Sequence, residues 1–224
     1  METRVLVGGD TSEAIDYFDS VIEPAPLVIG VVLALTLVLL TLVFRSIVVA
    51  GTAVVLNLLS VGAAYGLLVL VFQHGVGASL FGFQQVDSIE AWVPLFLFSV
   101  LFGLSMDYHV FLLSRIRERY DRTGDTTDAV SFGVSSTARI ITGAALIIVA
   151  VFAGFARGDL IMFQQMGFGV AVALLLDATL IRSVLLPSAM HLLGRWNWYL
   201  PRWLEWLPRL QVEAPPRASS EPAR

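Results

Sequence analysis

The hydrophobic pattern of this chain consists of long apolar runs that are broken by short polar stretches. Five runs reach the roughly 17 to 25 residues that a membrane-spanning helix needs, and they cover residues 26–44, 47–72, 92–113, 140–156 and 160–193. No segment alternates polar and apolar residues in the manner of a membrane β-strand. The pattern therefore predicts an all-α, polytopic membrane helix bundle with five transmembrane helices.

The polar stretches between the runs predict the connections. Arg45 and Ser46 form a minimal turn, and residues 73–91 form a longer loop. Residues 114–139 form the main loop on the side of Arg45, and within it Asp125 is expected to cap a short helix that lies on the membrane surface.

The second run carries groups that suit helix packing. Gly62 and Gly66 are four residues apart, a spacing that lets another helix approach closely. Asn57, Ser60 and Tyr65 are expected to form hydrogen bonds between helices rather than to line a transport path.

Composition and charge support this topology, because 57% of the residues are hydrophobic and only 14% are charged. The arginines that fall on one side of a five-span arrangement are Arg45, Arg115, Arg117, Arg119, Arg122, Arg139, Arg195, Arg202, Arg209, Arg217 and Arg224. The positive-inside rule makes that side cytoplasmic. We therefore expect a multi-pass plasma-membrane protein with its N-terminus outside and its C-terminus in the cytoplasm, in which the arginines reflect topology and not nucleic-acid binding.

The chain divides into three predicted parts. Residues 1–25 lack the basic and apolar regions of a signal peptide although they must be translocated, which favours a chain whose upstream half is missing. Residues 26–194 are the five-helix transmembrane domain. Residues 195–224 are a cytoplasmic aromatic segment and a tail, of which 211–224 is expected to be disordered. The expected interface anchors are Trp196, Trp198, Tyr199, Trp203 and Trp206.

A carboxylate interrupts the third apolar run. Asp107 lies about 7 Å inward of the midpoint of this run, and a charged group near the bilayer centre costs about 2.5 to 3.5 kcal/mol on insertion scales. Gly103 and Phe111 share its helix face, so a helix or a file of water can approach the carboxylate across the glycine. Tyr108 points about 100° away, so each side chain is expected to meet a group on another helix.

Asp107 is the candidate for proton chemistry. A low-dielectric environment disfavours an ionised carboxylate, whereas a tyrosine hydroxyl that donates to it favours the ionised form. These opposed effects suit a group that binds and releases a proton near neutral pH. The alternative is a permanently protonated Asp107 that holds two helices together.

Three further ionisable residues lie in or beside the apolar runs. Asp177 is near the centre of the fifth run, and Arg182 follows five residues later. Because five residues is a poor pairing distance on an α-helix, each is expected to pair with another helix in a mainly structural role. His109 is ionisable near physiological pH, but a lone histidine at this depth is not assigned a function.

Motifs of membrane enzymes are not found. Met106 stands directly before Asp107, where the Gly-X-Gly-Asp motif of an intramembrane aspartyl protease has glycine, and directly after Ser105, where the Gly-X-Ser-Gly motif of an intramembrane serine protease has glycine. The sequence has no Walker loop, no zinc-protease motif and no cysteine, so neither an enzymatic activity nor a cofactor or metal is expected. If the protein does work, an ion gradient is therefore its expected energy source. Each charge that crosses the membrane releases about 2.3 kcal/mol for each 100 mV of membrane potential.

Four motifs follow one another in the chain: GLSMDYHVFLLSRIRE at 103–118, LDATLIR at 176–182, Leu-Pro at 186–187 and GRWNW at 194–198. In this order they resemble the C-terminal membrane half of MMPL transporters, which belong to the resistance-nodulation-division superfamily. The resemblance runs from about residue 5 to residue 203. Even VGGDT at 7–11 is similar to the end of the family's second extracellular porter domain, so residues 1–25 are expected to be a remnant of that domain.

The resemblance implies that the five spans are helices eight to twelve of a twelve-helix transporter. In that family an Asp-Tyr pair in the fourth helix of each half meets its counterpart at the centre and relays protons. Asp107 and Tyr108 match the second of these pairs. Asp177, Arg182 and Gly103 are expected to give structural or relay support.

The chain lacks the seventh helix, both large porter domains and the whole first half with its Asp-Tyr pair. We therefore expect the C-terminal half of a proton-motive-force-driven exporter of lipids or other hydrophobic compounds. Its expected partners are membrane lipids, a hydrophobic substrate, and a complementary N-terminal half or other transporter subunits. The alternatives are a non-transporting membrane module that binds lipid or a partner protein, and an inactive gene remnant.

Overall fold

The computed structural model describes residues 9–201 and residue 204, and these residues form helices without any strand. Five helical segments are long and apolar enough to cross a membrane, which confirms the predicted all-α, polytopic bundle. The main helices are α2 (Ala25–Phe44), α3 (Ile47–Leu68), α5 (Trp92–Thr123), α6 (Thr126–Ala156) and α7 (Ile161–Leu176).

Two of the spans change helix type along their length. α3 continues into a π-helical turn, η1 (Val69–Gln73), and α7 continues through a longer π-helical segment, η2 (Asp177–Leu185), into α8 (Leu186–Leu193). The fifth span is therefore one continuous helical rod of three parts.

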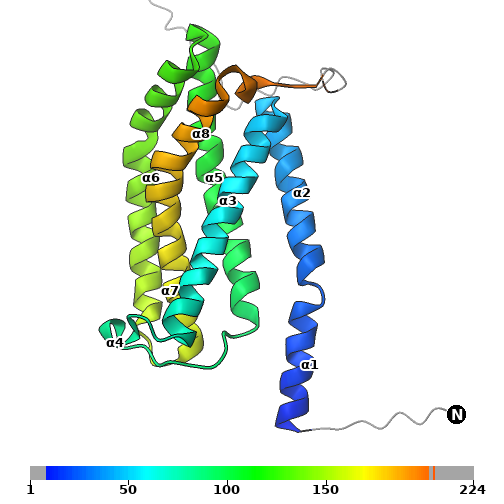
Figure 1. The fold of residues 1–224 in the computed structure, drawn as a ribbon, viewed down its shortest axis with the longest axis vertical. Helices are drawn as coiled ribbons and strands as arrows, with labels where there is room; N and C mark the ends of the chain where they lie inside the picture. Colours follow the sequence, from blue (N-terminus) through cyan, green and yellow to red (C-terminus); the bar gives the residue numbers. More distant parts are fainter. Residues whose placement is uncertain (1–8, 202–203, 205–224) are drawn as a thin grey trace, which may run out of the picture.

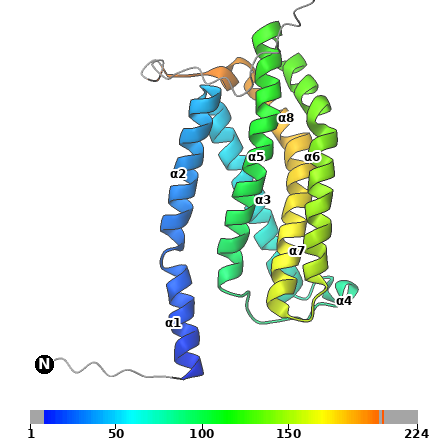
Figure 2. The ribbon, with the colours of Figure 1, turned by 180° about the vertical axis from the view of Figure 1, so that it is seen from behind.

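The helices pack around α7, which is buried against α3, α5 and α6 (Figure 1). Seen from behind, α2 lies at the side of this group beside α3 and is joined to it by the turn at Arg45 and Ser46 (Figure 2). The preceding helix, α1 (Asp10–Ile22), extends α2 beyond the bundle after a break at Glu23 and Pro24. Assignment of this segment to a porter domain stays a prediction, and residues 1–8 lie outside the described part.

The two ends of the bundle differ. At one end lie the Arg45–Ser46 turn, the connection between α5 and α6, and the 3-10 helix η3 (Gly194–Trp198); we call this the arginine end. At the opposite end lie the loop 74–91 with its short helix α4 (Ala78–Phe81) and the 157–160 turn; we call this the loop end. Gln165 ties the loop to α7, because its Oε1 accepts from the Glu90 backbone N–H at 2.9 Å.

The prediction of a long loop at residues 114–139 is wrong. α5 continues to Thr123 and α6 begins at Thr126, so only Gly124 and Asp125 connect them. Ion pairs at helical spacing, such as Arg117 with Asp121 at 3.0 Å, stabilise the polar extension of α5. The helices therefore project beyond the apolar zone, and no separate surface helix forms among the described residues.

The predicted cap at Asp125 is confirmed, although it caps a different helix from the one expected. Its Oδ1 accepts from the backbone N–H of Thr127 at 2.8 Å, at the start of the long helix α6. Asp128, three residues on, does not close a capping box but pairs with Arg119 of α5 at 2.7 Å. This pair joins the two helix ends where they leave the apolar zone.

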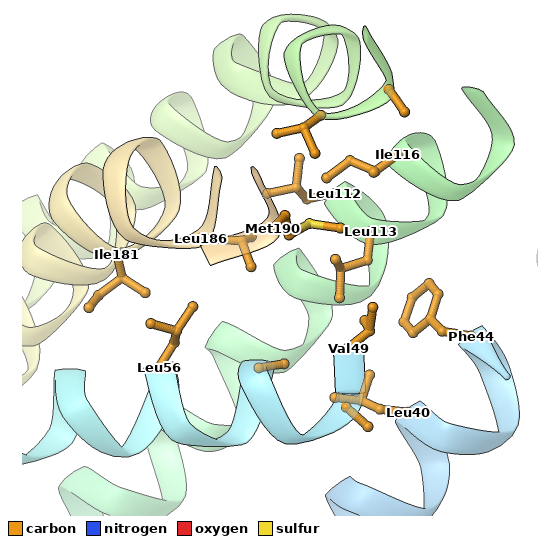
Figure 3. Packing of buried hydrophobic residues seen from close by; sticks show 14 of the residues in the cluster. Leu40, Phe44, Val49, Leu56, Leu112, Leu113, Ile116, Ile181, Leu186 and Met190 are labelled. Carbon is orange, nitrogen blue, oxygen red and sulfur yellow. The ribbon is translucent and has the colours of Figure 1, made fainter. Parts of the chain in front are cut away.

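A hydrophobic cluster fills the arginine-end half of the bundle. Figure 3 shows side chains from α2, α3, α5, η2 and α8 converging there. Met190 and Leu186 of α8 lie between Leu112 and Leu113 of α5 and the side chains of α3, and all four are at most 2% exposed. A second cluster occupies the loop-end half, between α3, α5 and α7.

Close helix approach occurs at glycines other than those expected. A Cβ on Gly62 or Gly66 would meet nothing within 4 Å, so no helix of the described chain packs there. A Cβ on Gly167 of α7 would lie 2.4 Å from the Ala156 nitrogen, and one on Gly133 of α6 would lie 2.3 Å from Ile116 Cγ1. Backbones therefore approach most closely where α6 meets its two neighbours in sequence.

The expected hydrogen bonds of α3 are confirmed at two of three positions. Ser60 donates to the Ala173 carbonyl at 3.4 Å, and Tyr65 donates to the Pro94 carbonyl. The Oδ1 atom of the third, Asn57, is buried without a partner.

The aromatic segment at the arginine end packs partly on protein. Trp196 and Tyr199 are 68% and 50% exposed, as expected for interface anchors. Trp198 instead stacks on Tyr120 with ring centroids 4.4 Å apart, and the Arg117 guanidinium lies 4.7 Å from its ring centre. The extended α5 therefore provides a protein surface for this ring, and the anchoring role expected of Trp198 stays a prediction. Trp203, Trp206 and the tail 211–224 lie outside the described residues.

Candidate functional site

The middle of α5 presents one exposed polar face inside the membrane span. Ser99, Gly103 and Asp107 follow one another at intervals of four residues, share this face and are all exposed. A Cβ added to Gly103 would meet nothing within 4 Å, so space beside the carboxylate is open as the sequence predicted. No helix of the described chain covers Asp107.

This exposure is energetically unusual for the depth at which Asp107 lies. A carboxylate in contact with hydrocarbon costs about 2.5 to 3.5 kcal/mol, and such residues face protein or a water-filled path. Within the described residues no hydrogen bond or ion pair engages the Asp107 side chain. The face is therefore suited to meet groups that this part of the chain does not supply.

The opposite face of α5 carries a buried polar cluster, which we define as Ser105, His109, Asp177 and Arg182. All four residues are at most 3% exposed. Arg182 Nε and Nη2 lie 2.9 Å and 2.8 Å from Asp177 Oδ2. Ser105 Oγ donates to the same carboxylate oxygen at 2.9 Å, and its backbone carbonyl accepts from Arg182 Nη2 at 2.8 Å. The cluster thus joins α5 to η2 within two of the candidate membrane spans.

The pairing of Asp177 with Arg182 corrects the expectation that a separation of five residues would keep them apart. In an α-helix, neighbours on one face are three or four residues apart. The segment from Asp177 to Leu185 is π-helical, in which hydrogen bonds span five residues. This wider turn brings the guanidinium back over the carboxylate. The expected contact to another helix also exists, through Ser105 of α5.

Tyr108 borders the buried polar cluster, and His109 belongs to it. The Arg182 guanidinium carbon lies 5.0 Å from the centre of the Tyr108 ring, within cation–π range. Tyr108 therefore meets a group on another helix, as its direction predicted, whereas Asp107 points away from it. The His109 Nδ1 atom is 3.1 Å from the Ser105 carbonyl.

Ser105 and His109 of the buried cluster had no predicted role. The available signal was their spacing of four residues, which places two polar side chains on one face of an apolar helix. Gly103, expected to support the relay, lies on the open face and does not touch the cluster. Two separate polar faces therefore flank the centre of α5.

The part of the chain that the structure describes contains no candidate metal site. In that part, no group of three His, Asp or Glu side chains lies close enough together to hold a metal ion. The charges of the buried cluster are instead one carboxylate and one guanidinium in direct contact. The arrangement thus holds the paired Asp177 and Arg182 on one face of α5 and the unpaired carboxylate of Asp107 on the other.

The chain was compared with protein families and with known proteins. The family model described as MMPL family matches residues 1–217, which is nearly the whole chain. The chain belongs to the MMPL family. Both polar faces of α5 and the whole five-helix bundle fall within the matched region.

Curated relatives include several mycobacterial proteins. The heme uptake protein MmpL11 of Mycobacterium tuberculosis is 46% identical over 213 residues, which is 95% of this chain and 22% of that protein. The mycolic acid-containing lipids exporter MmpL11 of Mycolicibacterium smegmatis is 47% identical over 210 residues, covering 93% of this chain and 22% of that protein.

A more distant relative is the trehalose monomycolate exporter MmpL3 of Mycolicibacterium smegmatis. It is 38% identical over 202 residues, covering 90% of this chain and 20% of that protein. The chain thus spans about a fifth of the length of the curated relatives it matches. The names of the three relatives describe a heme uptake protein, an exporter of mycolic acid-containing lipids and an exporter of trehalose monomycolate.

Proposed function

We propose that this chain is the C-terminal membrane part of a proton-motive-force-driven exporter of lipids or other hydrophobic compounds. The observation that carries the proposal is the position of Asp107, an acid in the middle of α5 on a face that no described helix covers. A carboxylate kept at that depth has a function that outweighs its insertion cost. Binding and release of a proton is the function that suits its chemistry.

The membrane potential supplies the energy for transport in this proposal. One charge that crosses a membrane potential of 100 mV releases about 2.3 kcal/mol. Asp107 takes up a proton from one side and loses it to the other when its surroundings change. Tyr108 supports the step as the second member of the Asp-Tyr pair, and the Asp177–Arg182 pair holds α5 and η2 in register beside it.

A complementary half completes the relay in this proposal. The stripe of Ser99, Gly103 and Asp107 is narrow and lacks large side chains, so another helix can approach the carboxylate closely. The relatives are about five times as long as the matched segment, which leaves room for that half and for extracellular domains. The five spans would then be helices eight to twelve of the assembled transporter.

The proposed orientation follows from charge. The arginine end faces the cytoplasm by the positive-inside rule, and the loop end and the N-terminus lie outside the plasma membrane. The projecting ends of α5 and α6, with the Arg119–Asp128 pair, then reach into the cytoplasm. The substrate class, lipids and other hydrophobic compounds, is proposed from the names of the relatives and from the apolar surface of the bundle.

A chimera tests the proposal. The matched segment of the Mycolicibacterium smegmatis lipid exporter MmpL11 is replaced by this chain, and export of its lipid is measured in cells whose own copy is deleted. We expect the chimera to export and Asp107→Asn to abolish export without lowering its amount in the membrane. Asp159→Asn, an exposed acid in the loop-end turn, is the matched control and should leave export unchanged.

The outcomes separate the alternatives. Full export by the Asp107→Asn chimera would remove the proton role of this carboxylate. A correctly inserted chimera that never exports would instead favour a non-transporting module or an inactive remnant. Proton uptake by purified chimeras in proteoliposomes, followed with an internal pH-sensitive dye, distinguishes loss of coupling from loss of substrate binding.

A further inference from the structure

The loop at the loop end carries apolar side chains that the described chain leaves exposed. Residues 75–86 contain no charged residue. Within them Val76, Leu80 and Phe81 are 59%, 81% and 56% exposed. Apolar side chains that gather on a surface in this way mark a contact with a membrane or with another protein. The position of the loop decides between these two partners.

The loop folds back along the bundle instead of projecting beyond it. The ring centroids of Phe81 and Phe83 lie 5.9 Å and 5.6 Å from that of Phe168 in α7. Phe168 follows Ile161, the first residue of α7, by seven positions, which corresponds to about 10 Å along the helix. Because α7 is part of a candidate membrane span, the apolar part of the loop is level with residues inside that span.

Charged residues of the loop lie nearer to the end of the bundle. The Gln165 side chain of α7 donates to the Ser88 carbonyl at 3.4 Å and accepts from the Glu90 N–H at 2.9 Å. Asp87 and Glu90 are exposed at this level. Gln165 precedes Phe168 by three residues, or about 4.5 Å along α7. The loop thus has charges on the outside and aromatic rings about one helical turn further in, which is the order of a membrane boundary.

The local sequence allows this fold-back. Gly75, Gly77 and Gly82 have φ angles of 70°, 74° and 74°, in the left-handed region that glycine adopts most easily. Gly77 and Gly82 stand at the two ends of α4. Gln85 holds the returning chain against the end of η1, because its Nε2 donates to the Gln73 carbonyl at 2.7 Å.

Much of the loop backbone is paired within the protein. The following N–H groups donate to carbonyls of the loop or of η1 at 2.9 to 3.2 Å: Val76, Ala78, Leu80, Phe83 and Val86. Backbone groups close to hydrocarbon need such internal partners, since lipid offers none. The backbone of this loop therefore suits a place at the membrane boundary, with apolar side chains directed further in.

The loop lies at the side of the bundle. Figure 1 shows α4 at the edge of the bundle away from α2, and Figure 2 shows the same arrangement from behind. The sides of a transmembrane bundle face lipid, whereas an external domain sits over its end. Lipid is therefore the partner that the position of α4 favours.

We propose that residues 75–86 form an interfacial anchor that inserts Leu80 and Phe81 into the lipid leaflet at the loop end. A segment of this length is typical of interfacial segments and too short to cross a bilayer. Anchors of this kind reach about 5 to 10 Å into the boundary between headgroups and acyl chains. Contact with Phe168 ties the anchor to α7. The assignment depends neither on the proton role of Asp107 nor on the direction in which the chain crosses the membrane.

Single spin labels measure the depth of the proposed anchor. The chain has no cysteine, so one nitroxide label can be attached to each full-length variant in phosphatidylcholine and phosphatidylglycerol nanodiscs. Leu80→Cys tests the anchor. Val151→Cys, on the exposed side of α6, is the lipid reference, and Asp159→Cys, in the loop-end turn, is the water reference.

The label reports its surroundings through its collisions with O₂, which concentrates in lipid, and with a water-soluble nickel chelate. We expect the ratio of O₂ to nickel collisions at residue 80 to be close to that at 151 and several-fold above that at 159. A ratio equal to that at 159 would place the loop in water and overturn the proposal. Low collision rates with both reagents would mean that protein covers the loop, and this result would overturn it as well.

Reaction of the same cysteines with a water-soluble maleimide gives a second test. The thiolate is the reacting form and is disfavoured in apolar surroundings. We expect Leu80→Cys to react many-fold more slowly than Asp159→Cys in nanodiscs, and at the same rate after the protein is unfolded in detergent. Ser88→Cys is the matched control, because it lies in the same loop beside Asp87 and is exposed; it should react as Asp159→Cys does. Equal rates for Leu80→Cys and Ser88→Cys in nanodiscs would contradict the assignment.

Discussion

Ser105 and Asp107 lie two residues apart on α5 and face opposite environments: Ser105 is fully buried against Asp177, and Asp107 is exposed. Two residues turn an α-helix through about 200°. One helix thereby presents a closed polar cluster on one side and an open carboxylate on the other. Changes at the two positions should consequently have different effects on stability and on transport.

Asp107→Asn should leave the stability of the chain unchanged. Because the Asp107 side chain is exposed and forms no hydrogen bond or ion pair within the described residues, we expect the free energy of unfolding to change by less than about 0.5 kcal/mol, as for surface substitutions. The measurement is reversible unfolding of the chain in mixed micelles. A large loss of stability would show that Asp107 holds helices together as a structural acid.

Arg182→Met should strongly destabilise the chain. Removal of one partner of a buried ion pair leaves an uncompensated charge and costs about 3 to 5 kcal/mol. The double variant Asp177→Leu with Arg182→Met removes both charges and should recover most of the loss. The same unfolding measurement compares the three proteins, and a double variant no more stable than the single one would contradict the pairing.

Gly167→Ala should destabilise the bundle, because the new methyl group would lie 2.4 Å from the Ala156 nitrogen and 2.5 Å from the Phe152 oxygen. Overpacking of this kind costs about 1 to 3 kcal/mol. Gly103→Ala is the matched control and should be neutral in the chain alone, since its methyl group meets open space. In the chimera, however, Gly103→Ala should reduce export if a helix of the other half packs beside Asp107.

Trp198→Ala should loosen the arginine end of the bundle. It removes the stacking on Tyr120 and the cation–π contact with Arg117, together worth about 1 to 2.5 kcal/mol. Trp196→Ala removes an exposed ring and should change the free energy of unfolding little. Equal effects of the two variants would indicate that Trp198 acts through the membrane interface and not through α5.

Much of the architecture could be predicted from the apolar runs. The turn at Arg45 and Ser46 and the limits of α2 follow directly from where hydrophobicity stops. The polar end of α5 was missed because hydrophobicity marks the membrane and not the helix. The spacing of Arg117 and Asp121 was the available signal that the helix continues.

The candidate site was predictable in part. Asp107, Asp177 and Arg182 stand out in the sequence because each is a charged residue within an apolar run. Their mutual contact was not predictable, because α-helical spacing argues against it and a π-helical segment has no clear sequence signature. The burial of His109 depends on which face of α5 meets η2, and that is decided by tertiary packing.

The π-helical segment also sets the phase of the last span. Each of its turns holds more residues than an α-helical turn, so every position after Leu185 is rotated relative to where an uninterrupted α-helix would place it. Leu186 and Met190 point into the bundle in consequence. Deletion of a single residue between Asp177 and Arg182 would therefore misalign α8 as well as separate the ion pair, which makes the length of this short stretch as important as its composition.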